Sequence, residues 1–278
     1  MSDKSTFTVN KKAHSGKVVQ QTALAGDCYR MLIEAPEIAK TAGAGQFVHV
    51  LPRQVESTSP LLRRAFSIMT INNGCIEILY RALGRGTTLM SRWQAGQEID
   101  LLGPLGRPFA KPEHPLLLIG GGVGTPPLVM LAWQTRQEQP GLTIKALIAA
   151  KTASEVLGKD DFLKSDADVA VATDDGSEGH HGFVTELLEQ QFMDNQLDYS
   201  IYACGPLPML RAVSSICTKY DRRALLSLEE NMPCGVGVCN GCSIPVLNGE
   251  GDYGQYSRIC VDGPSMWSDQ IDWAKLRI

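Results

Sequence analysis

The sequence has no strong excess of charge of either sign and no long hydrophobic run. Its 278 residues carry 26 lysines and arginines against 30 aspartates and glutamates, a net charge of −4, and no basic block. Because nucleic-acid binding relies on clustered positive charge, we expect no nucleic-acid partner. The longest apolar runs, such as PLLLIGGGVG, are broken by glycine far short of the roughly 20 residues that a membrane helix needs. We therefore expect no membrane segment.

A secretion signal is also lacking. Residues 1–20, MSDKSTFTVNKKAHSGKVVQ, contain no apolar stretch of the kind that signal peptides carry. We expect a cytoplasmic protein, a setting in which disulfides are rare. The eight cysteines therefore do not suggest a disulfide framework, which is typical of short secreted chains. Internal repeats and low-complexity tracts are absent too.

The length predicts two or three domains. Residues 1–112 alternate polar and apolar residues in short runs between glycines and prolines, as in GQFVHVLP, RRAFSIM, CIEILYRAL and EIDLLGPLG. This pattern is typical of an antiparallel barrel or sandwich, and we predict an antiparallel β-barrel. The stretch TTLMSRWQAG predicts one short helix, ended by Gly96.

The pattern changes after residue 112. Residues 113–223 begin with the continuous apolar run PLLLIG and then alternate strand and helix signals, which predicts an α/β domain with a parallel sheet. Residues 224–278 form a small, loop-rich segment that needs an internal staple to be stable. The predicted fold class is thus multidomain α+β: a β-barrel, a parallel-sheet domain and a small C-terminal module.

Four cysteines in the C-terminal module follow the spacing C-x4-C-x2-C-x17-C, and they are Cys234, Cys239, Cys242 and Cys260. Zinc sites more often use two C-x2-C pairs, whereas a gap of four and then two is typical of plant-type [2Fe–2S] ligands. Glycines between them allow the backbone to wrap N–H groups around negatively charged sulfur. We favour a [2Fe–2S] cluster, and zinc or disulfides remain the alternatives.

The stretch RRAFSI in the first domain suggests a flavin site. Arg64 offers a guanidinium that matches phosphate oxygens, Phe66 could support a ring system, and Ser67 could hydrogen-bond a flavin nitrogen. Downstream, Gly86 and Thr87 could present a backbone N–H and a hydroxyl to a phosphate. The alternative is an ordinary surface strand, and each motif alone is weak.

The stretch IGGGVGTPPL follows a predicted strand and opens a predicted helix, a setting in which glycines approach a pyrophosphate. The candidate contacts are Gly121, Gly122, Gly124 and Thr125, together with Asp174 and Asp175 and, in YACGPLPML, Cys204, Gly205 and Pro206. The two aspartates disfavour a 2′-phosphate and so favour NAD over NADP, although a solvated turn is an equal alternative. Cys204 lies at a strand end, where a nicotinamide could bind and where a small core residue is also common.

The order of these motifs carries more information than any one of them. A β-barrel with R-x-F-S, then G-G-G-V-G-T, then C-G-P-x-P-M resembles the ferredoxin–NADP reductase superfamily. With MPCGVGVCNGC and ICVDGP added, nearly the whole chain is similar to the electron-transfer subunits of heteromeric, NAD-linked dihydroorotate dehydrogenases. The cysteine run with C-x-D-G-P is the most specific part of this resemblance.

The resemblance implies one FAD between the first two domains, one [2Fe–2S] cluster on the four cysteines, and NAD as substrate. It implies that Ser67 and Cys204 position the nicotinamide against the flavin. It also implies a partner, an FMN-containing catalytic subunit, in a two-plus-two assembly, whose electrons pass through the cluster and FAD to NAD+. The FAD contacts implied are Arg64, Ala65, Phe66, Ser67, Leu79, Tyr80, Arg81, Gly86 and Thr87.

Two departures and two rival functions accompany this resemblance. Pro126 and Pro127 follow the glycine turn, and Lys151 and Thr152, which follow the next strand, could meet a phosphate and leave the choice between NAD and NADP open. The first rival is a related flavin and iron–sulfur subunit of an NAD(P)H:ferredoxin or sulfide oxidoreductase. The second is a zinc-stapled scaffold without enzymatic activity.

Overall fold

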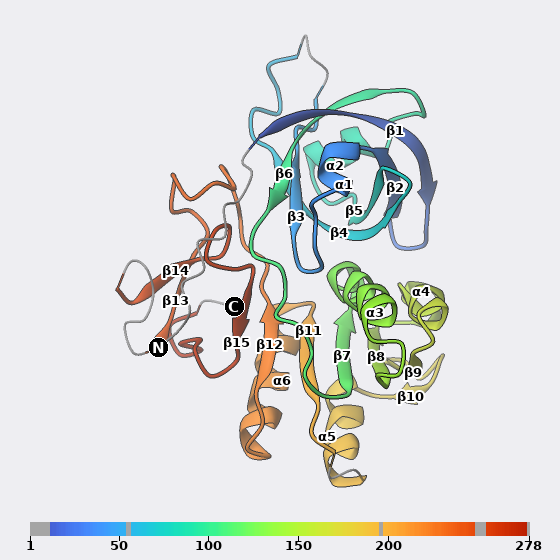
Figure 1. Ribbon diagram of the computed structural model, residues 1–278, viewed down its shortest axis with the longest axis vertical. Helices are drawn as coiled ribbons and strands as arrows, with labels where there is room; N and C mark the ends of the chain where they lie inside the picture. The colour runs from blue at the N-terminus through green and yellow to red at the C-terminus, as the bar shows by residue number, and fades with distance from the viewer. Residues whose placement is uncertain (1–11, 54–56, 195–196, 248–253, 277–278) are drawn as a thin grey trace.

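The computed structural model describes residues 12–53, 57–194, 197–247 and 254–276. Its N-terminal part, at the top of Figure 1, is a closed barrel with strand order β1-β2-β5-β4-β3-β6, in which every neighbouring pair is antiparallel. The predicted antiparallel barrel is therefore confirmed. Its elements are β1 (Ala13–Ala23), β2 (Cys28–Glu34), α1 (Pro36–Ala39), β3 (Phe47–Val50), β4 (Arg64–Asn72), β5 (Cys75–Arg81), α2 (Arg85–Met90) and β6 (Glu98–Leu105).

Alternation along the strands fills the barrel. Met31 and Ile33 on β2 and Ile76 and Ile78 on β5 are completely buried, while the residues between them are partly exposed. The predicted helix begins and ends earlier than expected, at Arg85 and Met90. The reason is a cap: the Thr87 hydroxyl accepts hydrogen bonds from the backbone N–H groups of Leu83 and Gly84.

The second part is a sheet of order β10-β9-β8-β7-β11-β12-β15, parallel except for its last strand. This confirms the predicted parallel sheet. Its strands are β7 (Leu116–Gly121), β8 (Ile144–Ala150), β9 (Asp168–Thr173), β10 (His180–His181), β11 (Ser200–Cys204), β12 (Ala224–Ser227) and β15 (Ser265–Trp267). Its helices are η1 (Gly122–Gly124), α3 (Pro126–Glu138), η2 (Ala153–Glu155), α4 (Lys159–Lys164), α5 (Val184–Asp194) and α6 (Leu207–Lys219).

The C-terminal segment contributes the small pair β13 (Ser243–Pro245) and β14 (Tyr256–Arg258) and then returns to the large sheet through β15. Thus β12 and β15 both lie beyond residue 223, yet both belong to the sheet. Ile244, Ile259 and Cys260 share one hydrophobic core with Leu117 of β7. The segment is stabilised by this shared core, in addition to any cofactor it holds.

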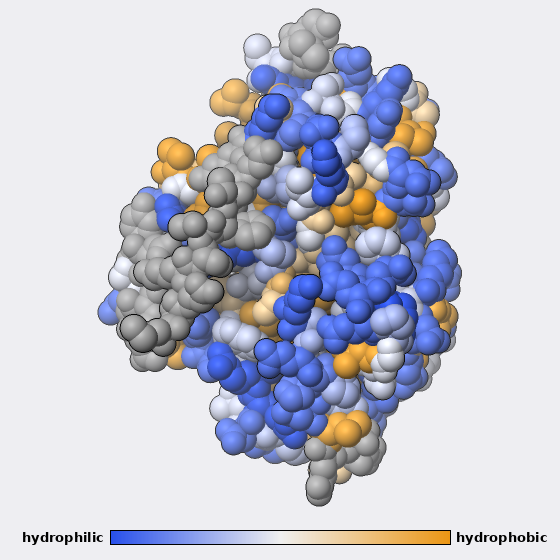
Figure 2. Space-filling view, in the orientation of Figure 1, coloured by the Kyte–Doolittle hydropathy of each residue, from blue (hydrophilic) through white to orange (hydrophobic). Residues whose placement is uncertain are grey.

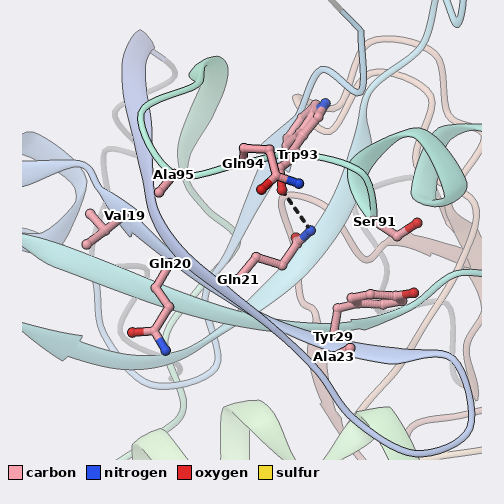
Figure 3. Close-up of a pocket in the computed structure, with 9 residues that line it drawn as sticks. All are labelled: Val19, Gln20, Gln21, Ala23, Tyr29, Ser91, Trp93, Gln94 and Ala95. Atoms are coloured by element: carbon pink, nitrogen blue, oxygen red, sulfur yellow. Dashed lines mark hydrogen bonds between the residues drawn. The ribbon is translucent and has the colours of Figure 1, made fainter.

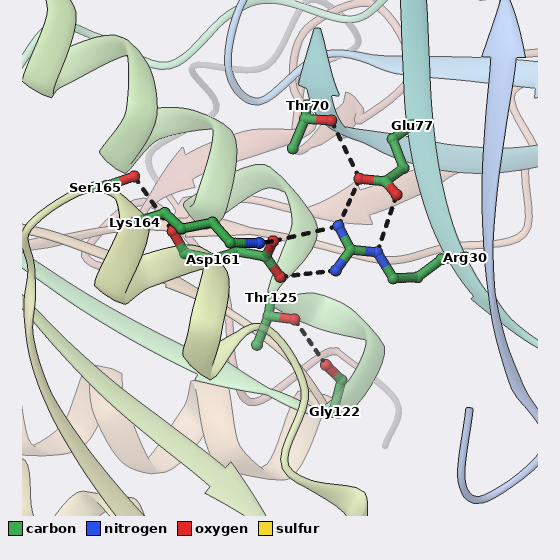
Figure 4. A network of polar contacts seen from close by, with 8 residues as sticks. All are labelled: Arg30, Thr70, Glu77, Gly122, Thr125, Asp161, Lys164 and Ser165. Atoms are coloured by element: carbon green, nitrogen blue, oxygen red, sulfur yellow. Dashed lines mark hydrogen bonds and ion pairs between the residues drawn. The ribbon is translucent and has the colours of Figure 1, made fainter. Parts of the chain in front are cut away.

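Helix packing and one arginine side chain join the barrel to the parallel-sheet part. Helix α3 packs against β4, the strand that carries R-x-F-S. Arg30 on β2 donates hydrogen bonds to Glu77 on β5 and to Asp161 on α4, so one guanidinium joins the two parts (Figure 4). The face shown in Figure 2 is mostly hydrophilic, with hydrophobic residues in separate small groups. Within the described residues, no helix combines the length and apolar character of a membrane span.

Candidate functional site

Arg64 and Gly86 are brought together although α2 lies well after β4 in the chain. A Cβ on Gly86 would lie 3.3 Å from Arg64 Nε and 3.0 Å from Pro52 Cγ, so the guanidinium passes directly over a residue without a side chain. Arg64 donates only to the backbone carbonyls of Leu62 and Arg63, and has no acidic partner among the described residues. The geometry leaves a cationic group next to exposed backbone, which suits a phosphate.

The other predicted flavin residues differ in whether their side chains already have a partner within the protein. The Ser67 hydroxyl makes no hydrogen bond within the described chain, and Ser67 lies opposite Phe47 of β3. Phe66 packs at 5.6 Å, ring centre to ring centre, against Tyr80. The Ser67 hydroxyl is therefore available to a ligand, while the Phe66 ring is held in place by its contact with Tyr80.

The side chains of Leu79, Tyr80 and Arg81 make their contacts within the protein. Leu79 and Tyr80 are buried, and the Tyr80 hydroxyl donates to Gln21 Oε1 at 2.8 Å. Arg81 contacts Cys28 Sγ and, at 3.4 Å, a carboxylate oxygen of Glu155 in η2. These residues can offer a flavin only their backbone, or in the case of Arg81 a side chain that must leave its partners. Thr87 likewise uses its hydroxyl to cap α2.

In the nucleotide part, two glycine turns meet. A Cβ on Gly124 would lie only 2.6 Å from Gly205 Cα, and a Cβ on Gly121 would lie 2.8 Å from Met209 Sδ and 3.1 Å from Pro206 Cδ. The glycine turn after β7 and the C-G-P turn after β11 thus touch backbone to backbone. Gly122, with φ of 53°, has open space where a side chain would be. A ligand can approach the backbone closely there.

Thr125 is completely buried, and its hydroxyl donates to the Gly122 carbonyl, as Figure 4 shows. It stabilises the turn from inside. Asp174 and Asp175 are exposed after the carboxyl end of β9. Asp175 accepts hydrogen bonds from the Ser177 hydroxyl and backbone, which lower the pKa of its carboxyl and hold it ionised.

Cys204 ends β11, with Gly120 of β7 and Ser227 of β12 as its neighbours in the sheet. Burial, helped by the carboxylate of Glu229, raises the pKa of this thiol, which therefore stays protonated. Glu229, whose charge acts on the Cys204 thiol, is a candidate site residue that sequence reasoning missed. Its side chain is open to solvent but densely surrounded by protein, and this partial desolvation raises the pKa of its carboxyl. No sequence motif marks this glutamate.

All eight cysteines, which lie in the described part of the chain, are free thiols. The four C-terminal ones lie as two neighbouring pairs, Cys234 with Cys239 and Cys242 with Cys260, in which each thiol influences the pKa of the other. No three His, Cys, Asp or Glu side chains of the described residues gather as a ready site for one metal ion. A two-iron cluster takes two protein ligands on each iron, and two thiol pairs suit that division.

In the loop of residues 234–242, called the cysteine loop below, the local electrostatics favour the thiolate form of Cys234 and Cys242. Although burial opposes it, backbone N–H groups of Cys239, Val236 and Val238 bring the pKa of Cys234 down to about 6. The thiol of Cys260, by hydrogen bonding to Cys242, lowers the pKa of Cys242 to about 7, while its own pKa rises. Gly235 and Gly237 have φ of 69° and 81°, which turns backbone N–H groups inward as expected. The donor set therefore fits a metal that binds thiolate.

Two families match this chain over separate stretches. Residues 118–215 match the oxidoreductase NAD-binding domain, and residues 229–272 match the iron–sulfur cluster binding domain of dihydroorotate dehydrogenase B. The dihydroorotate dehydrogenase B (NAD(+)) electron transfer subunit of Shouchella clausii is 39% identical over 92% of this chain and 96% of its own length. The corresponding subunit of Desulforamulus reducens is 35% identical over 94% and 99%.

This chain belongs to that family. It is an electron-transfer subunit of an oxidoreductase, as the resemblance implied. Among solved structures, a chain of the NADH-dependent reduced ferredoxin–NADP oxidoreductase superposes with a TM-score of 0.81 at 27% identity, covering 94% of this chain and 91% of that one. A ferredoxin NADP+ reductase from Neisseria gonorrhoeae with bound FAD and NADP, at 17% identity and a TM-score of 0.62, shares the fold over 75% of this chain.

Two cavities are lined by none of the predicted site residues of this electron-transfer subunit, although Gln21 and Tyr29 of the first contact Tyr80. One, of about 310 Å³, is formed by β1 and the segment after α2 and contains Tyr29 and Trp93 (Figure 3). The other, of about 410 Å³, lies at the amino ends of β11 and β12, opposite the glycine turns, and contains Tyr202 and Trp267. The candidate redox site is therefore not either of these cavities but the junction around β4, the glycine turns and the cysteine loop.

Proposed function

We propose that this subunit binds one FAD, one [2Fe–2S] cluster and NAD, and passes electrons from the FMN of a catalytic dihydroorotate dehydrogenase subunit to NAD+. One observation carries the proposal, the order of elements across the junction. The cysteine loop contacts β3 through Gly235 and His49, β3 pairs with β4 along Phe47–Val50, and β4 packs against α3, which follows the glycine turn. A cluster, a flavin and a nicotinamide held there would lie in that sequence.

FAD supplies the chemistry that this order needs, since a flavin can exchange one electron at a time with a cluster and a hydride with a nicotinamide. The residues of the chain bind and orient it. Arg64 would bind the pyrophosphate beside Gly86, and Ser67 would direct its free hydroxyl to the ring system. Cys204, neutral and small, would let the nicotinamide lie flat at the end of β11 without reacting with it.

The cluster would be held by Cys234 and Cys239 on one iron and by Cys242 and Cys260 on the other. The C-x4-C-x2-C spacing supports this assignment over zinc. The lowered pKa values of Cys234 and Cys242 favour the thiolate form that any such metal needs. The backbone N–H of Gly241 lies 3.4 Å from Cys239 Sγ and that of Val236 lies 3.5 Å from Cys234 Sγ. Such donors stabilise the negative charge of a cluster and help set its potential.

The nucleotide would be NAD. Asp175, whose carboxylate is held ionised by Ser177, and Asp174 beside it place negative charge after β9, where a 2′-phosphate would be repelled. Lys151 follows the neighbouring strand β8, and its carbonyl accepts the Asp175 backbone N–H. The two carboxylates outweigh this single cation.

The partner would dock over the cysteine loop, in a complex of two catalytic and two electron-transfer subunits in the cytoplasm. Val238 lies between Cys234 and Cys239 and is 78% exposed, an apolar side chain on the loop that must come near the partner's flavin. Desolvating such a residue favours association.

The test is anaerobic co-purification with the catalytic subunit, followed by analysis of flavin, iron, sulfide and zinc and by an assay of NAD+ reduction driven by dihydroorotate. We expect one FAD, two irons and two sulfides per chain, a mass for two subunits of each kind, and reduction of NAD+ in preference to NADP+. A colourless protein with one zinc would contradict the cluster. A loaded protein that reduces ferredoxin but accepts no electrons from dihydroorotate would contradict the partner.

A further inference from the structure

Strand β3 carries a buried histidine whose ring nitrogens make no hydrogen bond to the described residues. His49 is completely buried, and within the described part of the chain neither Nδ1 nor Nε2 has a hydrogen-bond partner. Buried polar side chains nearly always have a partner, because an unpaired one loses its hydration without compensation. The site of His49 is therefore complete only when another group supplies that partner.

The ring faces the cysteine loop. A Cβ on Gly235 would lie 2.6 Å from Cε1, 2.7 Å from Nδ1 and 3.0 Å from Nε2 of His49. These nearly equal distances place that Cβ over the face of the imidazole, so the ring packs flat against the residue that follows Cys234 and both nitrogens lie beside the cysteine loop. Two features require a glycine at position 235. Its φ is 69°, and any side chain there would collide with the imidazole ring.

The ring also adjoins the candidate flavin strand. His49 lies opposite Ala65 of β4 in the antiparallel register, and the carbonyl of His49 accepts a hydrogen bond from Arg63. Burial, with the charges of Arg63 and Arg64, lowers the pKa of the imidazole to about 4. The ring is therefore neutral near pH 7, with one N–H to donate.

We propose that His49 is a positioning residue of the iron–sulfur centre, donating its N–H to a sulfur atom of the cluster at the Cys234 end. The inference rests on the proposed [2Fe–2S] cluster. Sulfur atoms of the cluster carry negative charge, so they are strong acceptors for a buried donor. The bond would fix the cysteine loop against β3 and stabilise the reduced cluster, which carries one more electron.

The test compares His49→Leu, His49→Gln and Phe47→Leu in the full chain co-expressed with its catalytic partner. Glutamine keeps an N–H donor, whereas leucine does not. Phe47 is the matched control: it lies two residues away on the same strand with its ring 5.8 Å from that of His49, but it faces Gly106. The readouts are iron and sulfide content, the midpoint potential of the cluster, and the EPR spectrum of the reduced protein with 15N-labelled histidine.

For His49→Leu we expect the ratio of reduced to oxidised cluster at a fixed potential to fall about tenfold, a lowering of ~59 mV. His49→Gln should restore most of it, Phe47→Leu should leave it unchanged, and the labelled wild type should show a nitrogen coupling that His49→Leu abolishes. If His49→Leu loses its cluster, retention in His49→Gln supports the inference and loss in both variants overturns it.

An intact cluster in His49→Leu with the wild-type potential and nitrogen coupling would also overturn the inference. A wild-type protein without iron and sulfide would instead refute the proposed function itself, so the two failures can be told apart.

Discussion

The guanidinium of Arg30 on β2 lies 3.0 Å, Nη1 to Oδ2, from the carboxylate of Asp161 on α4, and this contact joins the barrel to the nucleotide sheet. The same guanidinium makes a second pair, with Glu77, at 2.6 Å, and Glu77 accepts a further hydrogen bond from Thr70 (Figure 4). Hydrogen bonding to Glu77, opposed by burial, raises the pKa of Arg30. One cation thus serves two carboxylates from different parts of the fold.

Asp161→Asn should therefore loosen the junction. Asp161 is buried, so losing its charge leaves Arg30 with only Glu77 and should lower the free energy of unfolding by about 1–3 kcal/mol. Denaturant titration measures the change. Asp160→Asn is the matched control, since Asp160 is exposed on the same turn and makes no bond to Arg30. Equal stabilities of the two variants would show that the contact is not structural.

Cys239→Ser should abolish the iron–sulfur absorbance, because serine offers no thiolate to the cluster and the Cys234 pair is broken. We also expect faster proteolysis of the segment after residue 227. Cys75→Ser in the barrel strand β5 serves as control and should keep full iron and sulfide. Unchanged iron and sulfide in Cys239→Ser would remove this cysteine from the ligand set.

Arg64→Ala should weaken FAD binding by about 1.5–3 kcal/mol, roughly tenfold to a hundredfold in Kd, through loss of a charged hydrogen bond. Fluorescence titration of the flavin-free protein measures this. Arg92→Ala, an exposed arginine after α2, should leave the affinity as it was. If both variants bind FAD like the wild type, Arg64 does not contact the pyrophosphate.

Cys204 should resist alkylation. Because burial raises the pKa of an acid by disfavouring its charged form, the thiol remains protonated, and hence unreactive, at about pH 8. In cluster-free protein, iodoacetamide should modify the exposed Cys239 first, with Cys204 reacting only after unfolding in guanidinium. Peptide mass spectrometry identifies the sites. Rapid modification of Cys204 in the folded chain would point instead to a reactive thiolate.

Much of the architecture could be predicted because its signals are local. The alternation that begins CIEILYRAL matches β5, whose first residues alternate between partly exposed and buried, and the continuous run in PLLLIG matches β7, buried on both faces. The alternation in GQFVHVLP also predicts a strand, but β3 is buried throughout because His49 lies inside the protein too. The sequence could not show that β15 returns to the large sheet. Three residues, Ser265–Trp267, carry no period of their own, and their place depends on pairing with β12.

In the candidate site, too, local patterns could be predicted from the sequence and contacts between distant residues could not. The cysteine spacing is a local pattern, and the structure does bring those thiols into pairs. His49 gave no signal, since one histidine within an apolar strand looks like any buried ring. Its significance depends on Gly235, which is distant in sequence, and on the lack of a partner for either nitrogen among the described residues. Tyr80 and Thr87 were predicted as cofactor contacts, yet their hydroxyls are engaged within the protein.

The strand β15 has a consequence for biosynthesis. Because it completes the sheet from beyond the last cysteine, a nascent chain cannot finish its nucleotide-binding half until Trp267 has left the ribosome. Iron delivery and closure of that half therefore concern the same stretch of polypeptide.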